Sequence, residues 1–171
     1  CARKCSRFPG DDVSPETPIC GGQDAVITFL SESGAYGHAG PVERIDTHIS
    51  VIFLIGDRVY KMKRAVRYSY VDYHTLEQRE RFCREEVVRN RRTAPDLYLG
   101  VTPVTIEADG ALALKGAGEA VEWLVEMRRF DQDNLFDRLV VAGRLDAPMM
   151  TRLADRIHGF HQNAEVVSGV A

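Results

Sequence analysis

The chain lacks any long hydrophobic run. None of its apolar stretches approaches the roughly 20 residues that a membrane-spanning helix needs. The N-terminal segment Cys1–Cys5 carries charges with no apolar stretch behind it, which is not typical of a signal peptide. We therefore expect a cytoplasmic protein with no membrane partner. The chain does not begin with methionine, so we also expect a piece of a longer protein.

Cysteine is scarce, and its spacing fits no standard zinc site. The chain has four cysteines in 171 residues. Cys1, Cys5 and Cys20 lie in a polar, Pro/Gly-rich leader with no histidine near them, and Cys83 lies in a predicted helix. The sequence therefore predicts no bound metal, and reduced thiols that suit the cytoplasm.

Neither sign of charge dominates the composition. The 22 Lys and Arg residues against 25 Asp and Glu residues give a formal net charge of −3, so bulk electrostatics do not indicate a nucleic-acid or membrane partner. Hydrophobic residues make up 44% of the chain and charged residues 27%, as in ordinary soluble proteins. The length suits one domain with a sizeable core.

The order of the predicted elements is typical of an α+β fold. After a mobile leader over residues 1–23, a short helix begins within Ala25–Leu30. A hairpin of strands Thr47–Ile55 and Val59–Val66 follows, with Gly56-Asp57-Arg58 as its turn. Three more strands are predicted, at Tyr98–Ile106, Ala111–Leu114 and Ala120–Met127. The strands cluster early and the helices late, which argues against a parallel α/β sheet.

Thr75–Ala94 is the most strongly indicated helix. Thr75 can form a capping box with Gln78, and Ala94-Pro95 ends the helix. Two helices are predicted near the C-terminus, one at Asp133–Val141 with Asp133 or Asn134 as its cap and Gly143 as its stop. The second begins at Asp146, and its period-3.6 apolar stripe includes His161, which we interpret as a core histidine.

Two lysines lie on one face of the returning strand. In Val59-Tyr60-Lys61-Met62-Lys63, period-two alternation directs Lys61 and Lys63 to one side and Tyr60 and Met62 to the other. A strand that carries a lysine, followed by a helix that carries a glutamate, is how kinase-like folds hold the phosphates of ATP. The alternative is a solvated edge strand with two surface lysines.

A larger set of residues carries a resemblance to a known family. These residues are Thr47-His48-Ile49-Ser50, Phe53-Leu54, Val59–Lys63, Val71-Asp72-Tyr73, Thr75-Leu76-Glu77, Cys83–Glu86, Asn90-Arg91-Arg92, Ala94–Tyr98 and Met127–Phe130. Over roughly residues 26–165, the chain resembles the aminoglycoside-phosphotransferase branch of the protein-kinase-like fold. It is similar in particular to the kinase-like half of bifunctional proteins that also contain a P-loop ATPase domain.

The resemblance implies a nucleotide site. It makes Lys61 the phosphate-contacting lysine with Lys63 as the close alternative, and Glu86 the helix partner with Glu85 as the second choice. An ion pair that is shielded from water is stronger than an exposed one. The segment Val125–Arg129, with Glu126, Met127 and Arg128, would be the hinge whose backbone groups contact adenine.

Two more domain assignments follow from the resemblance, a kinase-like N-terminal lobe at 24–130 and a truncated, helical start of the C-terminal lobe at 131–171.

The motifs for phosphoryl transfer itself are missing from the sequence. The family needs an Asp in a His-Gly-Asp-like loop, together with an Asn and a second Asp for Mg²⁺. Gly159-Phe160-His161-Gln162 lies in a predicted helix and is not that loop, and no G-x-x-x-x-G-K-[ST] motif occurs. We therefore predict ATP binding, no catalytic residue and no turnover from this chain alone.

Three functions remain open at this point. The first is the nucleotide-binding part of a small-molecule kinase, which would meet its substrate only in the complete protein. The second is a pseudokinase-like module that binds a protein or a second copy of the chain. The third, a nucleic-acid binder that uses the arginines of the helix at 75–94, is disfavoured because the acids of that helix nearly offset them. Arg128 and Arg129 could contact a phosphate, but pairing with Asp131 or Asp133 competes.

Overall fold

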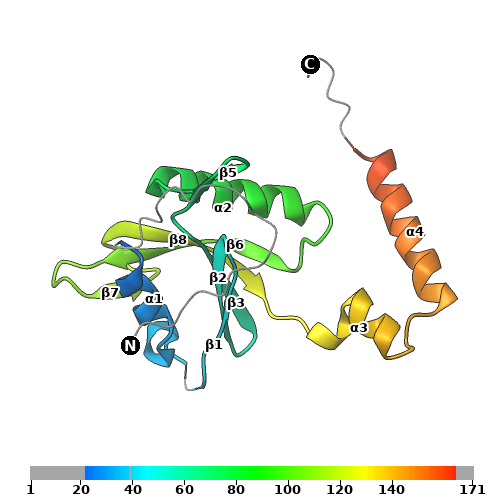
Figure 1. The fold of residues 1–171 in the computed structure, drawn as a ribbon, viewed down its shortest axis with the longest axis horizontal. Coiled ribbons are helices and arrows are strands. Elements are labelled where there is room, and N and C mark those ends of the chain that lie inside the picture. The colour runs from blue at the N-terminus through cyan, green and yellow to red at the C-terminus, as the bar shows by residue number, and fades with distance from the viewer. Residues whose placement is uncertain (1–21, 39, 165–171) are drawn as a thin grey trace, which may run out of the picture.

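A six-stranded antiparallel sheet lies at the centre of the fold (Figure 1). The computed structural model describes residues 22–38 and 40–164. The strand order is β1-β2-β3-β8-β6-β7. The bounds of these strands are β1 Glu43–Asp46, β2 Ser50–Ile55, β3 Arg58–Lys63, β6 Tyr98–Ile106, β7 Leu112–Leu114 and β8 Glu119–Arg128. A separate two-stranded ribbon pairs β4, Arg67–Tyr68, with β5, Val71–Asp72.

Helices cover both faces of the sheet and extend beyond it. In Figure 1, α2 lies over one face and α1 lies on the opposite side, while α3 and α4 stand apart from the sheet. The α-helices are α1 Asp24–Leu30, α2 Leu76–Arg91, α3 Phe136–Val141 and α4 Ala147–Gln162, and the 3₁₀ helices are η1 Ser33–Tyr36 and η2 Gln132–Asn134. The α+β prediction is confirmed.

The predicted hairpin is present as β2 and β3. Gly56 takes a positive φ of 53° in its turn, a conformation that glycine adopts without steric cost. β3 pairs with β2 on one side and with β8 on the other, so it is an interior strand. The alternative of a solvated edge strand is therefore wrong, because a distant strand completes the hydrogen bonding that local sequence leaves open.

Two apolar clusters fill the two faces of the sheet. Leu30 of α1 packs with Met62, Phe53 and Leu124 on the first face, and all four side chains are fully buried. On the second face, Cys83 and Val87 of α2 pack against Val125. The alternation of β3 therefore sends Met62 into the α1 cluster and leaves Lys61 and Lys63 on the α2 side, as the sequence predicts.

Cys83 also helps to seat α2 on the sheet. The Trp123 carbonyl of β8 accepts a hydrogen bond from the Cys83 thiol at 3.6 Å. Burial raises the pKa of that thiol to about 12, so Cys83 is a neutral core group rather than a reactive thiolate.

Four local predictions need correction or comment. The predicted leader includes Gln23, but the structure shows that Gln23 is buried. The predicted leader up to residue 21, with Cys1, Cys5 and Cys20, lies outside the described residues. The helix predicted at Asp133–Val141, with Asp133 or Asn134 as its cap, is shorter in the structure. α3 begins at Phe136 without a side-chain cap, because residues 132–134 form the 3₁₀ helix η2. α4 begins after Asp146 as predicted, yet none of its residues is buried, and His161 is exposed rather than in the core.

Within the described residues, no helix has both the length and the apolar character that crossing a membrane requires.

The N-terminus of α2 gives a local test of stability. The Thr75 hydroxyl accepts from the Gln78 amide at 3.2 Å, and the Gln78 side chain accepts from the Thr75 amide at 3.2 Å. We expect Thr75→Ala to lower the free energy of unfolding by about 1 kcal/mol, because the backbone amide of Gln78 loses the hydroxyl that caps it. Urea denaturation measures this, with Thr93→Ala beyond the other end of the helix as the control. Equal losses in both variants would contradict the capping role.

Candidate functional site

Glu86 bridges both lysines across the interface between the sheet and α2. Its Oε1 lies 3.0 Å from Lys61 Nζ, and its Oε2 lies 2.6 Å from Lys63 Nζ. The sequence left open which glutamate pairs with which lysine, and the structure brings Glu86 to both. Each carboxylate oxygen is therefore used by a different ammonium group.

The side-chain periodicities of β3 and α2 explain why Glu86 lies next to both lysines. Residues two apart on β3 share a face, which places Lys61 and Lys63 side by side. On α2, Arg79, Cys83 and Val87 are buried at intervals of four residues. Glu86 is three residues after Cys83, so it lies on the same side of the helix and its side chain reaches the sheet.

Burial and charge act in opposite directions on the Lys63–Glu86 pair. Burial alone would lower the pKa of Lys63, but the charge and hydrogen bond of Glu86 outweigh it and raise the pKa above the usual 10.5. Burial alone would raise the pKa of Glu86, but Lys63, and then Lys61, hold it below 4.5. Lys63 and Glu86 are thus charged at neutral pH, and with the second ammonium group, that of Lys61, the cluster has a formal net charge of +1.

Glu85 takes no part in this cluster. Its side chain pairs with Arg89 at 3.2 Å and with Arg81 at 3.7 Å on the outer surface of α2. Arg84 similarly pairs with Glu80 at 2.7 Å. These arginines are offset by acids of the same helix, so they do not form the unbalanced basic stripe that a phosphate backbone would need.

The backbone of the predicted hinge is largely occupied by the sheet. Val125 and Met127 are paired with β3 on one side and with β6 on the other. The amide of Arg128 donates to the Leu97 carbonyl, and the amide of Arg129 donates to the Asp57 carbonyl. The interpretation that Val125–Arg129 offers its backbone to adenine therefore needs correction, because β8 continues through Arg128 as a central strand.

The side chains of that segment also point in different directions. Glu126 lies on the face opposite to Lys61, where its Oε2 is 2.8 Å from Lys115 Nζ and accepts from the Thr102 hydroxyl at 2.7 Å. Met127 packs beside the Cys83 cluster. Arg128 is exposed, and Arg129 pairs with Glu43 at 2.8 Å rather than with Asp131 or Asp133.

The structure contains a buried polar network beside the lysines that the sequence does not predict. Glu122 is fully buried, and its carboxylate accepts from Arg79 Nε at 2.8 and 3.0 Å and from the Gln23 amide at 2.6 Å. The same Gln23 amide donates to the Lys63 carbonyl at 2.9 Å. The network thus joins α1, the end of β3, α2 and β8 at one point.

Residue type and local composition do not distinguish these residues from surface ones. Arg79 lies in a helix dense with exposed charges, and Glu122 alternates with apolar residues as a solvent-facing strand residue would. For Arg79, the one indication is its spacing: Cys83 and Val87 follow it by four and eight residues, which places all three on the same stripe of the helix.

The described residues contain no group of three or more His, Cys, Asp or Glu side chains that could hold a metal ion. The site itself presents two ammonium groups and one carboxylate.

Comparisons with known proteins give relatives of unknown activity. The chain is 32% identical over 120 residues to uncharacterized proteins of Mycobacterium tuberculosis and Mycobacterium bovis. The match covers 70% of this chain but only 22% of each relative, so the chain spans about a fifth of the length of the curated relatives it matches. No family model matches the chain, and no solved structure matches it.

Proposed function

We propose that Lys61, Lys63 and Glu86 form a clamp for the phosphates of ATP, in a lobe of the aminoglycoside-phosphotransferase-like kinase fold. The observation that carries this proposal is the Glu86 carboxylate, which bridges two strand lysines from the facing helix. Such a bridge fixes the position of both ammonium groups relative to α2. In kinases, the strand lysine and helix glutamate that place the ATP phosphates have this relation.

The charge of the cluster suits a polyphosphate. Two ammonium groups and one carboxylate leave one positive charge in a partly water-shielded position, where a phosphate contact is stronger than on an open surface. Lys61 keeps 28% of its side chain exposed, so a ligand can reach it. Lysine binds phosphate as a point charge with three donors.

We place the base farther along the same face. Val59 lies two residues before Lys61 on β3 and is opposite Met127 of β8, so both share the face of Lys61. A purine packs its ring against apolar side chains of this kind. Because the amides up to Arg129 are used within the fold, backbone contacts to the base would come from the segment that follows β8, near Phe130.

Transfer of the γ-phosphate needs more than this clamp. Bound ATP would bring its phosphates, and Mg²⁺ would neutralise their charge, but this chain's own residues supply only positioning. We propose nucleotide binding without turnover by this chain. Transfer to the hydroxyl of a small molecule would be a reaction of a longer protein, whose remaining part selects the substrate.

Calorimetry with ATP tests the proposal directly. We expect Lys61→Met to weaken ATP binding by about 10–100-fold, since a charge-assisted hydrogen bond to phosphate is lost. Lys115→Met is the matched control, because Lys115 pairs with Glu126 on the opposite face of the sheet. Equal binding by the three proteins, or no binding of millimolar ATP to the unaltered chain, would exclude the clamp.

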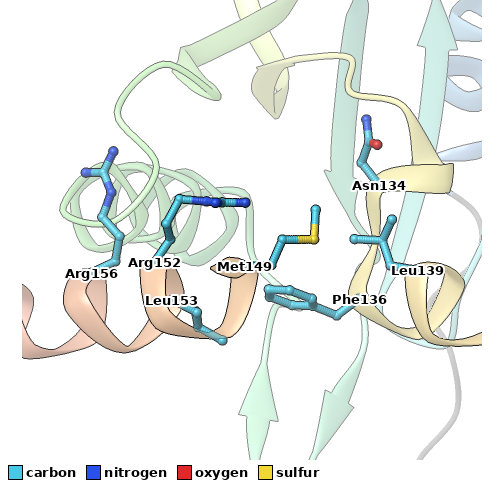
Figure 2. Close-up of a pocket in the computed structure, with 7 residues that line it drawn as sticks. All are labelled: Asn134, Phe136, Leu139, Met149, Arg152, Leu153 and Arg156. Atoms are coloured by element: carbon cyan, nitrogen blue, oxygen red, sulfur yellow. The ribbon is translucent and has the colours of Figure 1, made fainter. Parts of the chain in front are cut away.

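One observation favours a second candidate function, a protein-interaction module. A hollow of about 360 Å³ between α3 and α4 is lined by Phe136, Leu139, Met149 and Leu153, with Arg152 and Arg156 along one side (Figure 2). Met150 and Ile157 of α4 are each 47% exposed. Apolar surface of this kind is typical of a contact with another protein or a second copy. Sedimentation with and without ATP separates the two functions, because the module would associate regardless of nucleotide.

A further inference from the structure

We propose that the two lysines of the cluster have different tasks, with Lys63 as a positioning residue that fixes Glu86 and Lys61 as the ammonium that meets the ligand. The ligand, a nucleoside polyphosphate, rests on the function proposed above. The division between the lysines rests on burial and contacts alone, so it can be tested separately.

The first observation is the unequal exposure of the lysines. The Lys63 side chain is 4% exposed and that of Lys61 is 28% exposed. The Lys63–Glu86 contact is also the shorter, at 2.6 Å against 3.0 Å. A ligand from solvent therefore reaches Lys61 first, and Lys63 can be reached only through a rearrangement of its surroundings.

The second observation is the set of groups that hold Lys63 in place. Its ammonium lies 4.9 Å from the centre of the Tyr73 ring, a cation–π distance. Its backbone carbonyl accepts from the Gln23 side chain at 2.9 Å, and Gln23 is in turn bonded to the buried Glu122. Both ends of the residue are thus tied to the interior, which leaves Lys63 little freedom to follow a bound phosphate.

These contacts divide the carboxylate of Glu86 between a fixed and an exchangeable partner. When a phosphate approaches, Lys61 can leave Oε1 while Lys63 still neutralises the carboxylate at Oε2. The charge of Glu86 then does not repel the ligand as strongly as an unpaired carboxylate would. Lys63 acts through Glu86, and it touches no ligand itself.

Competitive labelling of the amines in the 171-residue chain tests the division without a mutation. The chain is exposed to trace acetic anhydride, and the rate at each lysine is read by mass spectrometry, with the exposed Lys115 as the reference. We expect Lys63 to react about tenfold more slowly than Lys61, because it is buried and its raised pKa leaves less free amine. Similar rates at the two lysines would overturn the positioning role.

Repeating the labelling with ATP separates the inference from the proposed function. We expect ATP to protect Lys61 and to leave the rate at Lys63 unchanged. Protection of Lys63 as strong as that of Lys61 would overturn the division, since both ammonium groups would then face the ligand. If Lys63 reacts slowly but ATP protects neither lysine, the nucleotide site and the ligand-facing role of Lys61 fail, while Lys63 remains the anchor of Glu86.

A pair of variants checks the role of Lys63 by binding. We expect Lys63→Met to weaken ATP binding, since Glu86 then retains Lys61 as its sole strand ammonium, and Lys63→Arg to restore part of it by restoring the charge. Lys61→Arg should bind less well than the unaltered chain, because guanidinium geometry differs at a direct contact. Equal ATP affinity of Lys63→Met and the unaltered chain would show that Glu86 needs no anchor.

Discussion

Replacing Arg79 by methionine should lower the free energy of unfolding by about 3–5 kcal/mol, the usual loss when one partner of a buried ion pair is removed. Glu122 is fully buried and depends on the two contacts from Arg79 Nε, at 2.8 and 3.0 Å. Arg79 Nη1 also donates to the carbonyls of Tyr73 and His74, each at 3.1 Å. The substitution leaves a buried charge and two carbonyls without these donors.

Urea denaturation of two further variants makes this result specific. Arg89→Met removes an arginine that is 75% exposed and paired with Glu85, and it should cost less than about 0.5 kcal/mol. The double variant Arg79→Met, Glu122→Met should regain much of the loss, because no unpaired charge stays buried. If Arg79→Met and Arg89→Met cost the same, the buried network does not stabilise the fold.

Replacing Glu86 by glutamine should lower the free energy of unfolding by about 2–3 kcal/mol at neutral pH. Lys63, with 4% of its side chain exposed, would lose its anionic partner and remain charged in the interior. The loss is smaller than at Arg79, because Lys61 is partly exposed and the glutamine oxygen can still accept a hydrogen bond. Glu85→Gln, at a surface pair, is the matched control and should have little effect.

The difference between the unaltered chain and Glu86→Gln should also depend on pH. The folded-state pKa of Glu86 is depressed below 4.5, so its contribution is present above that value and is lost as pH falls through the lower folded pKa. The pKa of Lys63 is raised above 10.5, so its contribution is present below that value and is lost as pH rises through the higher folded pKa. Denaturation at pH 3, 7 and 11 should show the largest difference at pH 7. A constant difference would mean that the pair does not depend on charge.

Local patterns were enough to predict most of the secondary structure and the part of the site that lies on β3, namely Lys61 and Lys63. The alternation in Val59–Lys63 places both lysines on the same face, and the capping box at Thr75 sets where α2 begins. These features depend on periodicity and on contacts within a few residues. The preference for Glu86 over Glu85 followed from the family resemblance, and the three-residue spacing of Glu86 from the buried Cys83 agrees with it.

Other predictions failed where distant segments decide the outcome. β3 is an interior strand because β8, about 60 residues later, pairs with its free side. The hinge expected at 125–129 lies largely on β8, where pairing with β3 and β6 uses the backbone of residues 125–127. The apolar stripe of α4 suggested a core position for His161, and periodicity alone does not tell whether any partner covers such a face.

The sequence by itself determined the α+β class, the hairpin, the main helix and the common face of Lys61 and Lys63, since all follow from residue-to-residue periodicity. Only the tertiary structure decided that Glu86 bridges both lysines, that Lys63 is buried while Lys61 is not, and that Gln23, Arg79 and Glu122 form one buried network. The physical reason is that burial and charge pairing depend on which helices and strands contact each other in the fold. These contacts join residues that are 23 to 99 positions apart in the chain, and at such separations the sequence spacing does not predict which side chains are neighbours.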